Sequence, residues 1–304
     1  MKPTLRQLQY LVAIADTHSF SKAAQICAVS QPSLSQQVMD MEYHIGATLI
    51  ERRRNGAALT PVGQEILIRA RAILRDVEDM KALARDSGDD LTGTVRIGTL
   101  PSVGPYLLPL ATRELHAAYP QLRLQIYEER GSDLHAGLID GTRDVILAMP
   151  DNHADMQSLN LFHEYIYVCT APDDPLASSD KDIELTELAG RTLLSLGSSH
   201  SFGKIVHDLA QAAGAEISKS YEGTSLDAIR QMSAMGDVVA ILPSLYCLSE
   251  AASDPGLHVR KLNHKMAERD IGLIWRPSSP LARKFEKMGE TFAQAAQTLL
   301  GEAR

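Results

Sequence analysis

The 304-residue sequence has little of what several classes of protein require. Its three cysteines, Cys27, Cys169 and Cys247, are too few and too scattered for a disulfide framework or a clustered zinc site. No run of eighteen apolar residues occurs, and the first residues lack the apolar core of a secretory signal. These absences predict ordinary buried thiols, no bound metal, no membrane contact and a cytoplasmic location.

Motifs of common enzyme chemistry are also missing. The sequence has no glycine-rich phosphate loop, no Gly-x-Ser-x-Gly nucleophile elbow and no His-x-x-x-His metal pair. We therefore expect no enzyme activity, no catalytic residue and no cofactor. An enzyme or a small-solute-binding protein on an α/β domain is kept as a remote alternative, although a transport receptor would need the missing export signal.

Composition and charge indicate a globular chain of two or three domains. Hydrophobic residues make up 44% and charged residues 22%, and the formal net charge is −8. Residues 1–60 carry six basic and four acidic side chains, a net charge of +2, so the remainder carries −10. A mildly basic module on an acidic body is compatible with binding to nucleic acid, because phosphate contacts depend on the local field.

The first sixty residues have the pattern of three helices. Apolar residues at helical spacing predict a helix over 4–17, and a short helix follows Ser19 or Ser21, either of which can cap it. Ser30 can cap a third helix with Pro32 in its first turn.

The third helix has one apolar and one polar face. Leu34, Val38, Met41 and Ile45 form the apolar face. We expect the polar face to enter a DNA major groove, as in a helix-turn-helix. Its predicted DNA-binding residues are Gln31, Pro32, Ser33, Ser35 and Gln36. A three-helix bundle with a solvated polar face fits the same spacing.

A basic hairpin follows the third helix. Residues 49–52 and 57–59 read as short strands joined through Arg53, Arg54, Asn55 and Gly56. Such a hairpin behind a helix-turn-helix is a wing, and we expect Arg52, Arg53 and Arg54 to reach a minor groove or the phosphates. A solvated arginine loop is the alternative.

A long helix is predicted after the hairpin, with Thr60 as its cap and Pro61 at its first position. Its apolar residues alternate in steps of four and three: Ile66, Ala70, Ile73, Val77, Met80 and Ala84. This heptad spacing predicts a helix that pairs two copies of the chain. A hinge follows at residues 91–93.

From residue 94 onward strands alternate with helices, which is typical of an α/β domain. The strand candidates are residues 94–98, 122–126, 144–148, 165–169, 192–196 and 238–242. Sheets of this kind bind small ligands beyond the carboxyl ends of their strands.

These motifs resemble those of LysR-type transcriptional regulators. The resemblance rests on residues 20–24, 29–38, 49–52 and 59–63, and it covers the whole chain. It implies a winged helix-turn-helix at 1–60, a dimerisation helix at 61–90 and a regulatory domain at 91–304 like a periplasmic binding protein. Subdomain I would span about 91–163 and 268–304, and subdomain II about 164–267. The implied partners are double-stranded DNA, a small-molecule effector and further copies of the chain in a homodimer or homotetramer, with RNA polymerase as a candidate.

Within that family, residues 100–109 and 271–281 are similar to the peroxide-sensing OxyR branch. OxyR proteins carry a reactive cysteine directly after a histidine and a resolving cysteine nine residues later; the matching positions here are His200-Ser201 and Ala210. A serine hydroxyl cannot supply the thiolate that attacks peroxide. Either the chain is a natural relative with another signal, or it is a peroxide sensor carrying a Cys-to-Ser change at position 201.

The resemblance also implies an effector cleft in the regulatory domain. The matching residues are Ser102, His200, Ser201, Thr224, Ser225 and Arg269. Hydroxyls, free amides and an arginine favour a carboxylate or another anion. The alternative is structural: Ser102 and Ser225 would cap helices, and His200 would bond a loop carbonyl. We expect an occupied cleft to change how the two halves sit and thereby how the assembly bends DNA.

Overall fold

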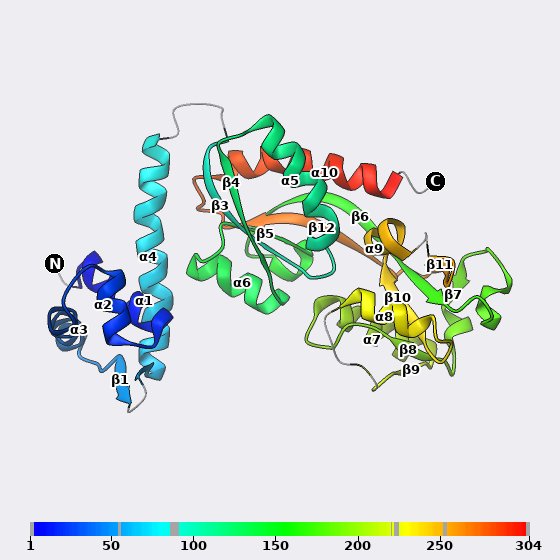
Figure 1. Ribbon diagram of the computed structural model, residues 1–304, viewed down its shortest axis with the longest axis horizontal. Coiled ribbons are helices and arrows are strands. Elements are labelled where there is room, and N and C mark those ends of the chain that lie inside the picture. Colours follow the sequence, from blue (N-terminus) through cyan, green and yellow to red (C-terminus); the bar gives the residue numbers. More distant parts are fainter. Residues whose placement is uncertain are drawn as a thin grey trace. The chain divides into compact units, whose positions relative to one another are not determined.

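The computed structural model describes residues 3–53, 56–85, 91–219, 221, 225–251 and 254–301 (Figure 1). The chain divides into two compact units. The first comprises Met1–Asp89 and Ala136–Thr142, and the second comprises Asp90–His135 and Arg143–Arg304. None of the described helices is both long enough and apolar enough to cross a bilayer.

The first unit begins with three short helices, then a hairpin and a long helix. Their bounds are α1 Leu5–Thr17, α2 Phe20–Ile26, α3 Gln31–Ile45, β1 Ile50–Arg53, β2 Gly56–Leu59 and α4 Pro61–Arg85. The hydroxyls of Thr4, Ser19 and Ser30 each accept a hydrogen bond from a backbone N–H in the first turn of α1, α2 and α3. Ser19, and not Ser21, therefore caps α2.

A single apolar core holds these elements together. Leu11, Leu34, Met41 and Leu49 are fully buried in it, and Ala23 lets α2 approach its neighbours closely. Ala70 of α4 belongs to the same core, with Ile66 packed against it. The first part of the predicted heptad stripe therefore packs within the unit. Ala84 lies outside the residues whose side chains are described.

The hairpin differs slightly from its predicted bounds. Arg53 lies opposite Gly56 in an antiparallel register, so β1 includes Arg53, which the sequence placed in the connecting loop. Gly56 has a φ of +135°, and a Cβ there would collide with the carbonyl oxygen of His18. Because Ala57 N–H also donates to that carbonyl at 2.8 Å, the hairpin is fixed against the turn after α1.

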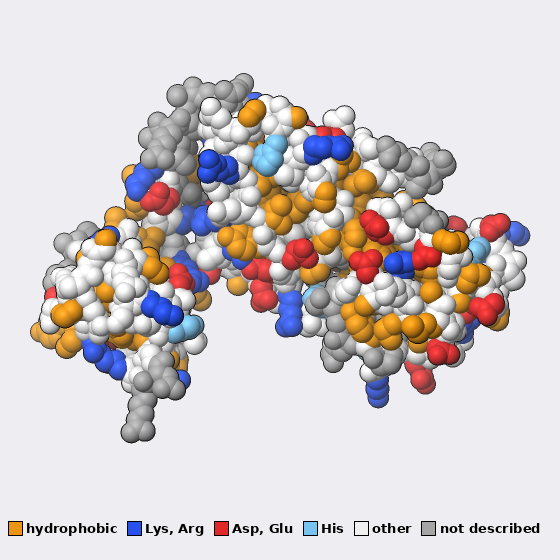
Figure 2. All heavy atoms as spheres, viewed as in Figure 1, with side chains coloured by type: hydrophobic (Ala, Val, Ile, Leu, Met, Phe, Trp, Pro, Cys, Tyr) orange, Lys and Arg blue, Asp and Glu red, His pale blue; other side chains and the backbone are white. Residues whose placement is uncertain are grey.

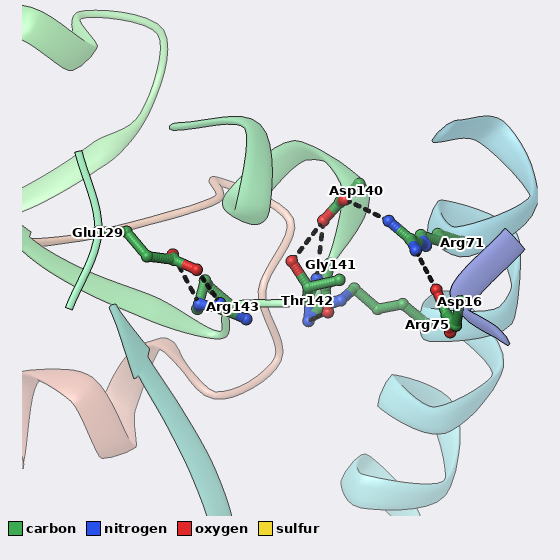
Figure 3. Close-up of polar contacts among 8 residues, drawn as sticks. All are labelled: Asp16, Arg71, Arg75, Glu129, Asp140, Gly141, Thr142 and Arg143. Carbon is green, nitrogen blue, oxygen red and sulfur yellow. Dashed lines mark hydrogen bonds and ion pairs between the residues drawn. The ribbon is translucent and has the colours of Figure 1, made fainter. Parts of the chain in front are cut away.

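Arginines of α4 hold the short segment Ala136–Thr142 in the first unit (Figure 3). Arg71 donates to Asp16 at 2.5 Å and to Asp140 at 2.9 Å, and Arg75 donates to the carbonyl oxygen of Gly141 at 2.5 Å. Asp140 also accepts hydrogen bonds from the backbone and the hydroxyl of Thr142. These contacts join side chains that lie 55 to 69 residues apart in the sequence.

The second unit is an α/β domain built on one long sheet. The strands follow the order β4-β3-β5-β12-β6-β10-β8-β9, and β11 pairs with β6 and β7. The strands are β3 Gly93–Thr99, β4 Leu122–Glu128, β5 Val145–Ala148, β6 Gln157–Thr170, β7 Ile183–Glu184, β8 Thr192–Leu194, β9 Glu216–Ile217, β10 Val239–Pro243, β11 His258–Asn263 and β12 Glu268–Trp275. The helices are α5 Gly104–Ala118, α6 Gly131–Asp140, η1 Pro150–His153, η2 Pro175–Ser178, η3 Leu185–Leu188, α7 Ser201–Ala213, α8 Leu226–Ser233, α9 Ser244–Tyr246, η4 Cys247–Ala251 and α10 Ala282–Gly301.

Two long strands run through the middle of this sheet. The first part of β6 pairs with β12, and its last part pairs with β10 and β11 (Figure 1). The sequence predicted only residues 165–169 of β6, and it predicted neither β11 nor β12. The division of this unit into two subdomains stays a prediction.

Candidate nucleic-acid interface and effector site

The third helix presents a polar face on the surface of the first unit. Leu34, Val38 and Met41 are buried, as the sequence predicts. On the other side, Gln31, Pro32, Ser33 and Gln36 are exposed and Ser35 is half-buried. The three-helix-bundle alternative shares this pattern, so exposure alone does not identify what the face contacts.

Neighbouring side chains hold this polar face in position. Ser21 of α2 donates to the side-chain oxygen of Gln31 at 2.6 Å, and the amide of Gln36 donates to Asp40 at 3.1 Å. Arg52 of the hairpin donates to the Ser35 hydroxyl, and its guanidinium carbon lies 4.7 Å from the centre of the Phe20 ring. One other helix, α2, and the hairpin therefore both contact α3 beside its polar face.

The predicted arginine tip is only partly described. Arg52 lies within β1, in the strand that the sequence predicts, and it contacts Phe20 of α2 and Ser35 of α3. Arg53 is exposed and pairs with Glu51 at 3.3 Å. Arg54 lies outside the described residues. Arg52 therefore does not project freely, because it contacts Ser35 and Phe20 of the same unit.

Glu42 is a positioning residue that the sequence analysis missed. Its carboxylate oxygen accepts hydrogen bonds from the backbone N–H groups of Leu49 at 2.7 Å and Ile50 at 3.0 Å. It thus joins the end of α3 to the start of β1. The sequence showed only a glutamate seven residues before a strand. Glutamates are common on surface helices, so this spacing did not indicate the role of Glu42.

Ser102 and Arg269, two of the predicted effector residues, lie together in a buried network. Arg269 donates to Glu164 at 2.7 Å and to the Ser102 hydroxyl at 3.2 Å, and its guanidinium lies 4.9 Å from the centre of the Phe202 ring. Glu164 also accepts from the backbone N–H of Leu245 at 2.9 Å. The Arg269 charge is thus balanced by Glu164, and its Nη1 has no hydrogen-bond partner within the described part of the chain.

Ser102 is not the helix cap that the alternative interpretation expected. The residue before α5 is Val103, which makes no side-chain cap, and Ser102 is buried against Arg269. Ser225 does cap α8, since its hydroxyl accepts from Ala228 N–H at 3.2 Å, and it is exposed. Thr224 lies outside the described residues. Ser102 and Arg269 are thus in direct contact, whereas Ser225 serves as a helix cap.

His200 and Ser201 lie at the start of α7. Ser201 is the first residue of that helix and lies close to the start of α6, because a Cβ on Gly131 would come within 2.6 Å of Ser201 Oγ. His200 is buried, and this burial, with the nearby charge of Arg130, lowers the pKa of its imidazole. Ala210, at the second OxyR cysteine position, is buried in the core on the same helix.

Two cavities adjoin α7. One, of about 630 Å³, is lined by residues of α6, η1 and α7 that include Ser132, His135, His153, Ser201 and Lys204. The other, of about 500 Å³, lies beyond β8 and includes Ser195, His207, Lys219 and Tyr221. Both have the size of small-molecule sites. Of the predicted effector residues that the structure describes, only Ser201 lines either cavity.

Two of the three cysteines are buried, as the sequence predicts, whereas Cys27 is half-buried. Cys169 and Cys247 are fully buried with their sulfur atoms 3.8 Å apart, and all three cysteines are free thiols. Burial raises the pKa of the Cys247 thiol well above its ordinary value. Within the described ranges, no group of three or more His, Cys, Asp or Glu side chains is arranged to hold a metal.

On the side of the second unit that Figure 2 draws, no patch of a single charge marks a functional face among the described residues. On the side drawn in Figure 2, acidic and basic side chains are interspersed among hydrophobic ones over this unit. The exposed polar face of α3, the hairpin beside it and a separate α/β unit with small-molecule cavities together define a class, the winged-helix transcription regulators with a regulatory domain.

The family follows from comparison with known proteins. Residues 5–64 match the bacterial regulatory helix-turn-helix proteins of the lysR family, and residues 88–297 match the LysR substrate binding domain. The chain belongs to the LysR family: it is a LysR-type transcriptional regulator with an N-terminal DNA-binding domain. The predicted fold class and the predicted resemblance to OxyR are both confirmed.

Similar proteins include several regulators of the OxyR group. The DNA-binding transcriptional dual regulator OxyR of Escherichia coli is 34% identical over 287 residues, 94% of this chain and 93% of that protein. A full-length OxyR from Pseudomonas aeruginosa with a cysteine-to-aspartate change has a TM-score of 0.79 at 31% identity, and the match covers 95% of this chain and 97% of that one. A peroxide-bound cysteine-to-serine mutant of Corynebacterium glutamicum OxyR has a TM-score of 0.67 at 31% identity, covering 100% and 95%.

Proposed function

We propose that this regulator reads its operator through the polar face of α3 and changes its DNA binding when a small effector occupies the regulatory domain. The proposal that α3 binds DNA rests on the contrast between the two faces of this helix. Its apolar side is buried in the unit, while Gln31, Ser33 and Gln36 are exposed. A helix anchored in this way can enter a major groove without unfolding, and glutamine and serine can bond base edges and phosphates.

The hairpin arginines would then have two roles. Arg53 and Arg54 are proposed to contact the phosphates or a minor groove beside the α3 site. Arg52 is proposed to act mainly as a positioning residue, because it contacts Ser35 and Phe20. Pro32 would shape the first turn of α3 and contact a base by its apolar ring.

Substitutions on the α3 face test the DNA part. Ser33→Ala and Gln36→Ala should each weaken binding to an operator selected from random duplexes by roughly tenfold, since a good side chain–base pair contributes about 1–3 kcal/mol. The measurement is a gel-shift titration at fixed salt. Gln121→Ala, an exposed glutamine of the other unit, is the matched control. Operator affinity that stayed unchanged in both α3 variants would contradict the proposal.

For the regulatory domain, we place the effector in the cavity of about 630 Å³ that borders Ser201. Lys204 and Ser132 supply a positive charge and a hydroxyl there, which suits a small carboxylate or another anion. The buried network of Ser102 and Arg269 is a weaker candidate for direct contact, because Glu164 already balances the arginine. It would respond to the effector through Phe202, which follows Ser201.

A thermal-shift screen tests this placement. Small mono- and dicarboxylates, sulfate and chloride are added to the full-length protein, and a true effector should raise the melting temperature in a concentration-dependent way. Lys204→Ala should reduce that shift, whereas Lys219→Ala, in the other cavity, should leave it unchanged. Equal melting-temperature shifts in the two variants would contradict the proposal that the effector binds in this cavity.

A second candidate is a peroxide sensor that carries serine at position 201. It is favoured by relatives named hydrogen peroxide-inducible genes activators, such as that of Pectobacterium carotovorum, 33% identical over 96% of this chain. Ala210 speaks against it, because it is a second departure from the OxyR pair. We also propose that the protein assembles as a homodimer through α4 and as a homotetramer on DNA, where RNA polymerase is a candidate partner.

A further inference from the structure

Three directions around α3 are occupied by the first unit itself. Leu34 and Met41 are fully buried on the side that faces the core. On one flank α3 contacts α1, because the backbone carbonyl and the side-chain oxygen of Gln37 accept hydrogen bonds from the Gln7 amide at 3.2 and 3.3 Å. On the other flank, the carboxylate of Glu42 accepts from the backbone at the start of the hairpin. The fourth direction points outward from the unit.

Four residues of α3 point in this outward direction. An α-helix turns by about 100° per residue, so Pro32, Gln36, Met39 and Tyr43, at steps of four, three and four, lie within a sector of about 60° opposite the buried side. We call these four residues the outward stripe. Met39 is 54% exposed and Tyr43 is 85% exposed. The Tyr43 ring meets His44 edge-on, with the ring centres 5.5 Å apart.

The second half of the outward stripe is apolar, and it continues the polar half that is proposed to read DNA. Single exposed apolar side chains are common on protein surfaces, but these two share one direction with Pro32 and Gln36. We propose that Met39 contacts the methyl group of a thymine in the major groove and that the Tyr43 hydroxyl donates to a phosphate at the rim of the groove. This inference rests on the proposed role of α3 and names two further residues of the same interface.

The length of α3 fits this division of roles. With a rise of 1.5 Å per residue, Met39 lies about 10 Å along the helix from Pro32, and Tyr43 lies about 16 Å from it. The major groove is about 12 Å wide. For a helix that crosses the groove with its first turn inside, Met39 lies within the groove and Tyr43 reaches the rim, where the phosphates are.

Gln36 and Met39 together favour an A·T base pair. They are neighbours at a spacing of three residues, with Cβ atoms about 5–6 Å apart. The Gln36 amide donates to Asp40 at 3.1 Å, which orients its side chain and leaves a second N–H and the carbonyl oxygen to meet a base edge. Glutamine bonds adenine through N6 and N7, and the thymine of that pair presents its methyl group in the same groove. An apolar thioether suits this methyl group better than a polar side chain would.

Deoxyuridine tests the thymine contact, because it lacks only the methyl group of thymidine. An operator is selected from random duplexes with the full-length protein, and each of its thymines is replaced in turn. At one or more positions we expect the unsubstituted protein to lose about fourfold in affinity in a gel-shift titration at fixed salt, as for one buried methyl group. Met39→Ala should bind the thymine and deoxyuridine forms of these positions equally.

The matched control is Met235→Ala, an exposed methionine of the second unit, which should keep the loss at those positions. If Met39→Ala kept that loss too, or if no thymine were sensitive, the thymine contact would be overturned and the apolar half of the stripe would be left to a protein partner. Gln36→Ala separates this inference from the proposed function. If it weakens operator binding while Met39→Ala keeps the deoxyuridine effect, α3 reads DNA without Met39. If neither Gln36→Ala nor Ser33→Ala weakens binding, the proposed role of α3 itself fails.

Tyr43→Phe tests the phosphate contact, since it removes the hydroxyl and keeps the ring. Phosphates carry no sequence information, so binding to the operator and to an unrelated duplex should weaken by the same factor, roughly fivefold. Tyr165→Phe, which changes a tyrosine 39% exposed in the second unit, should leave both affinities unchanged. Unchanged binding of both duplexes by Tyr43→Phe, or a loss confined to the operator, would overturn the assignment of Tyr43 to a phosphate.

Discussion

At the scale of single residues, position 201 is where this chain has a serine in place of the first cysteine of the OxyR motif. Ser201 is the first residue of α7 and follows a buried histidine, so the surroundings of a reactive residue are present without the sulfur. A helix N-terminus favours an anionic side chain, but a serine hydroxyl does not ionise in the range where a thiol does. The three cysteines do not replace it, since Cys169 and Cys247 are buried and Cys27 belongs to the first unit.

Restoring the sulfur should restore the reactivity. We expect Ser201→Cys to react with hydrogen peroxide to a sulfenic acid, because the start of α7 lowers the pKa of a thiol placed there. Without a partner at Ala210 the product should persist as the sulfenic acid, detectable by dimedone labelling and mass spectrometry. The unsubstituted protein should form no disulfide under the same treatment.

The control for this change is Ser198→Cys, an exposed position in the same loop and three residues before the helix. Its thiol lacks the helix N-terminus and should react more slowly. If the two introduced cysteines reacted at the same rate, the start of α7 would have no activating effect. A cysteine at position 201 would then not be enough to make this protein react rapidly with peroxide.

At the scale of elements, the helix starts of the first unit were predictable because their causes are local. A serine or threonine hydroxyl that accepts a backbone N–H is visible in the sequence, as at Thr4, Ser19 and Ser30. The end of the hairpin was less predictable. Arg53 joins β1 because Gly56 can lie against His18, and this contact joins residues from two different elements.

The strands of the second unit were harder still to predict, because they depend on contacts between residues far apart in the sequence. The second part of β12, residues 271–275, is buried and forms a continuous apolar run, which does not distinguish a strand from a buried helix. Its partners on β5 and β6 lie more than a hundred residues earlier. The buried pair of Arg269 and Glu164 had no local sign either, since charged residues inside strands usually indicate exposed positions.

The candidate sites also differ in how far the sequence predicted them. The α3 face was predicted because one helix supplies all its residues. The effector residues were carried over from a family motif, and no local pattern indicated their contacts: Ser102 contacts Arg269, 167 residues later, and Ser225 caps α8. The hydrogen-bonded histidines of the cavity, His135 and His153, were missed, because η1 is a short helix that no periodicity indicates.

At the scale of the whole molecule, the described chain leaves apolar side chains of α4 uncovered. Ile73 is 45% exposed and Met80 is 68% exposed, and they lie seven residues apart on one side of the helix. Ile66 and Ala70, the earlier members of the same predicted stripe, pack into the core of the first unit instead. The first residues of the stripe therefore pack within the first unit. The later ones, Ile73 and Met80, are exposed among the described residues and can pair with another copy of the chain.

Charge on this stripe should separate the copies. Ile73→Glu with Met80→Glu places like charges opposite one another in a paired helix, so the assembly should fall to monomers in size-exclusion chromatography with light scattering. Operator affinity should fall as well, because two linked modules bind a two-part site more tightly than one. The control is Met235→Glu, which changes a methionine 78% exposed in the second unit. If the α4 variant kept both its assembly and its operator affinity, another surface would join the copies, and the heptad spacing of α4 would reflect only its packing within the first unit.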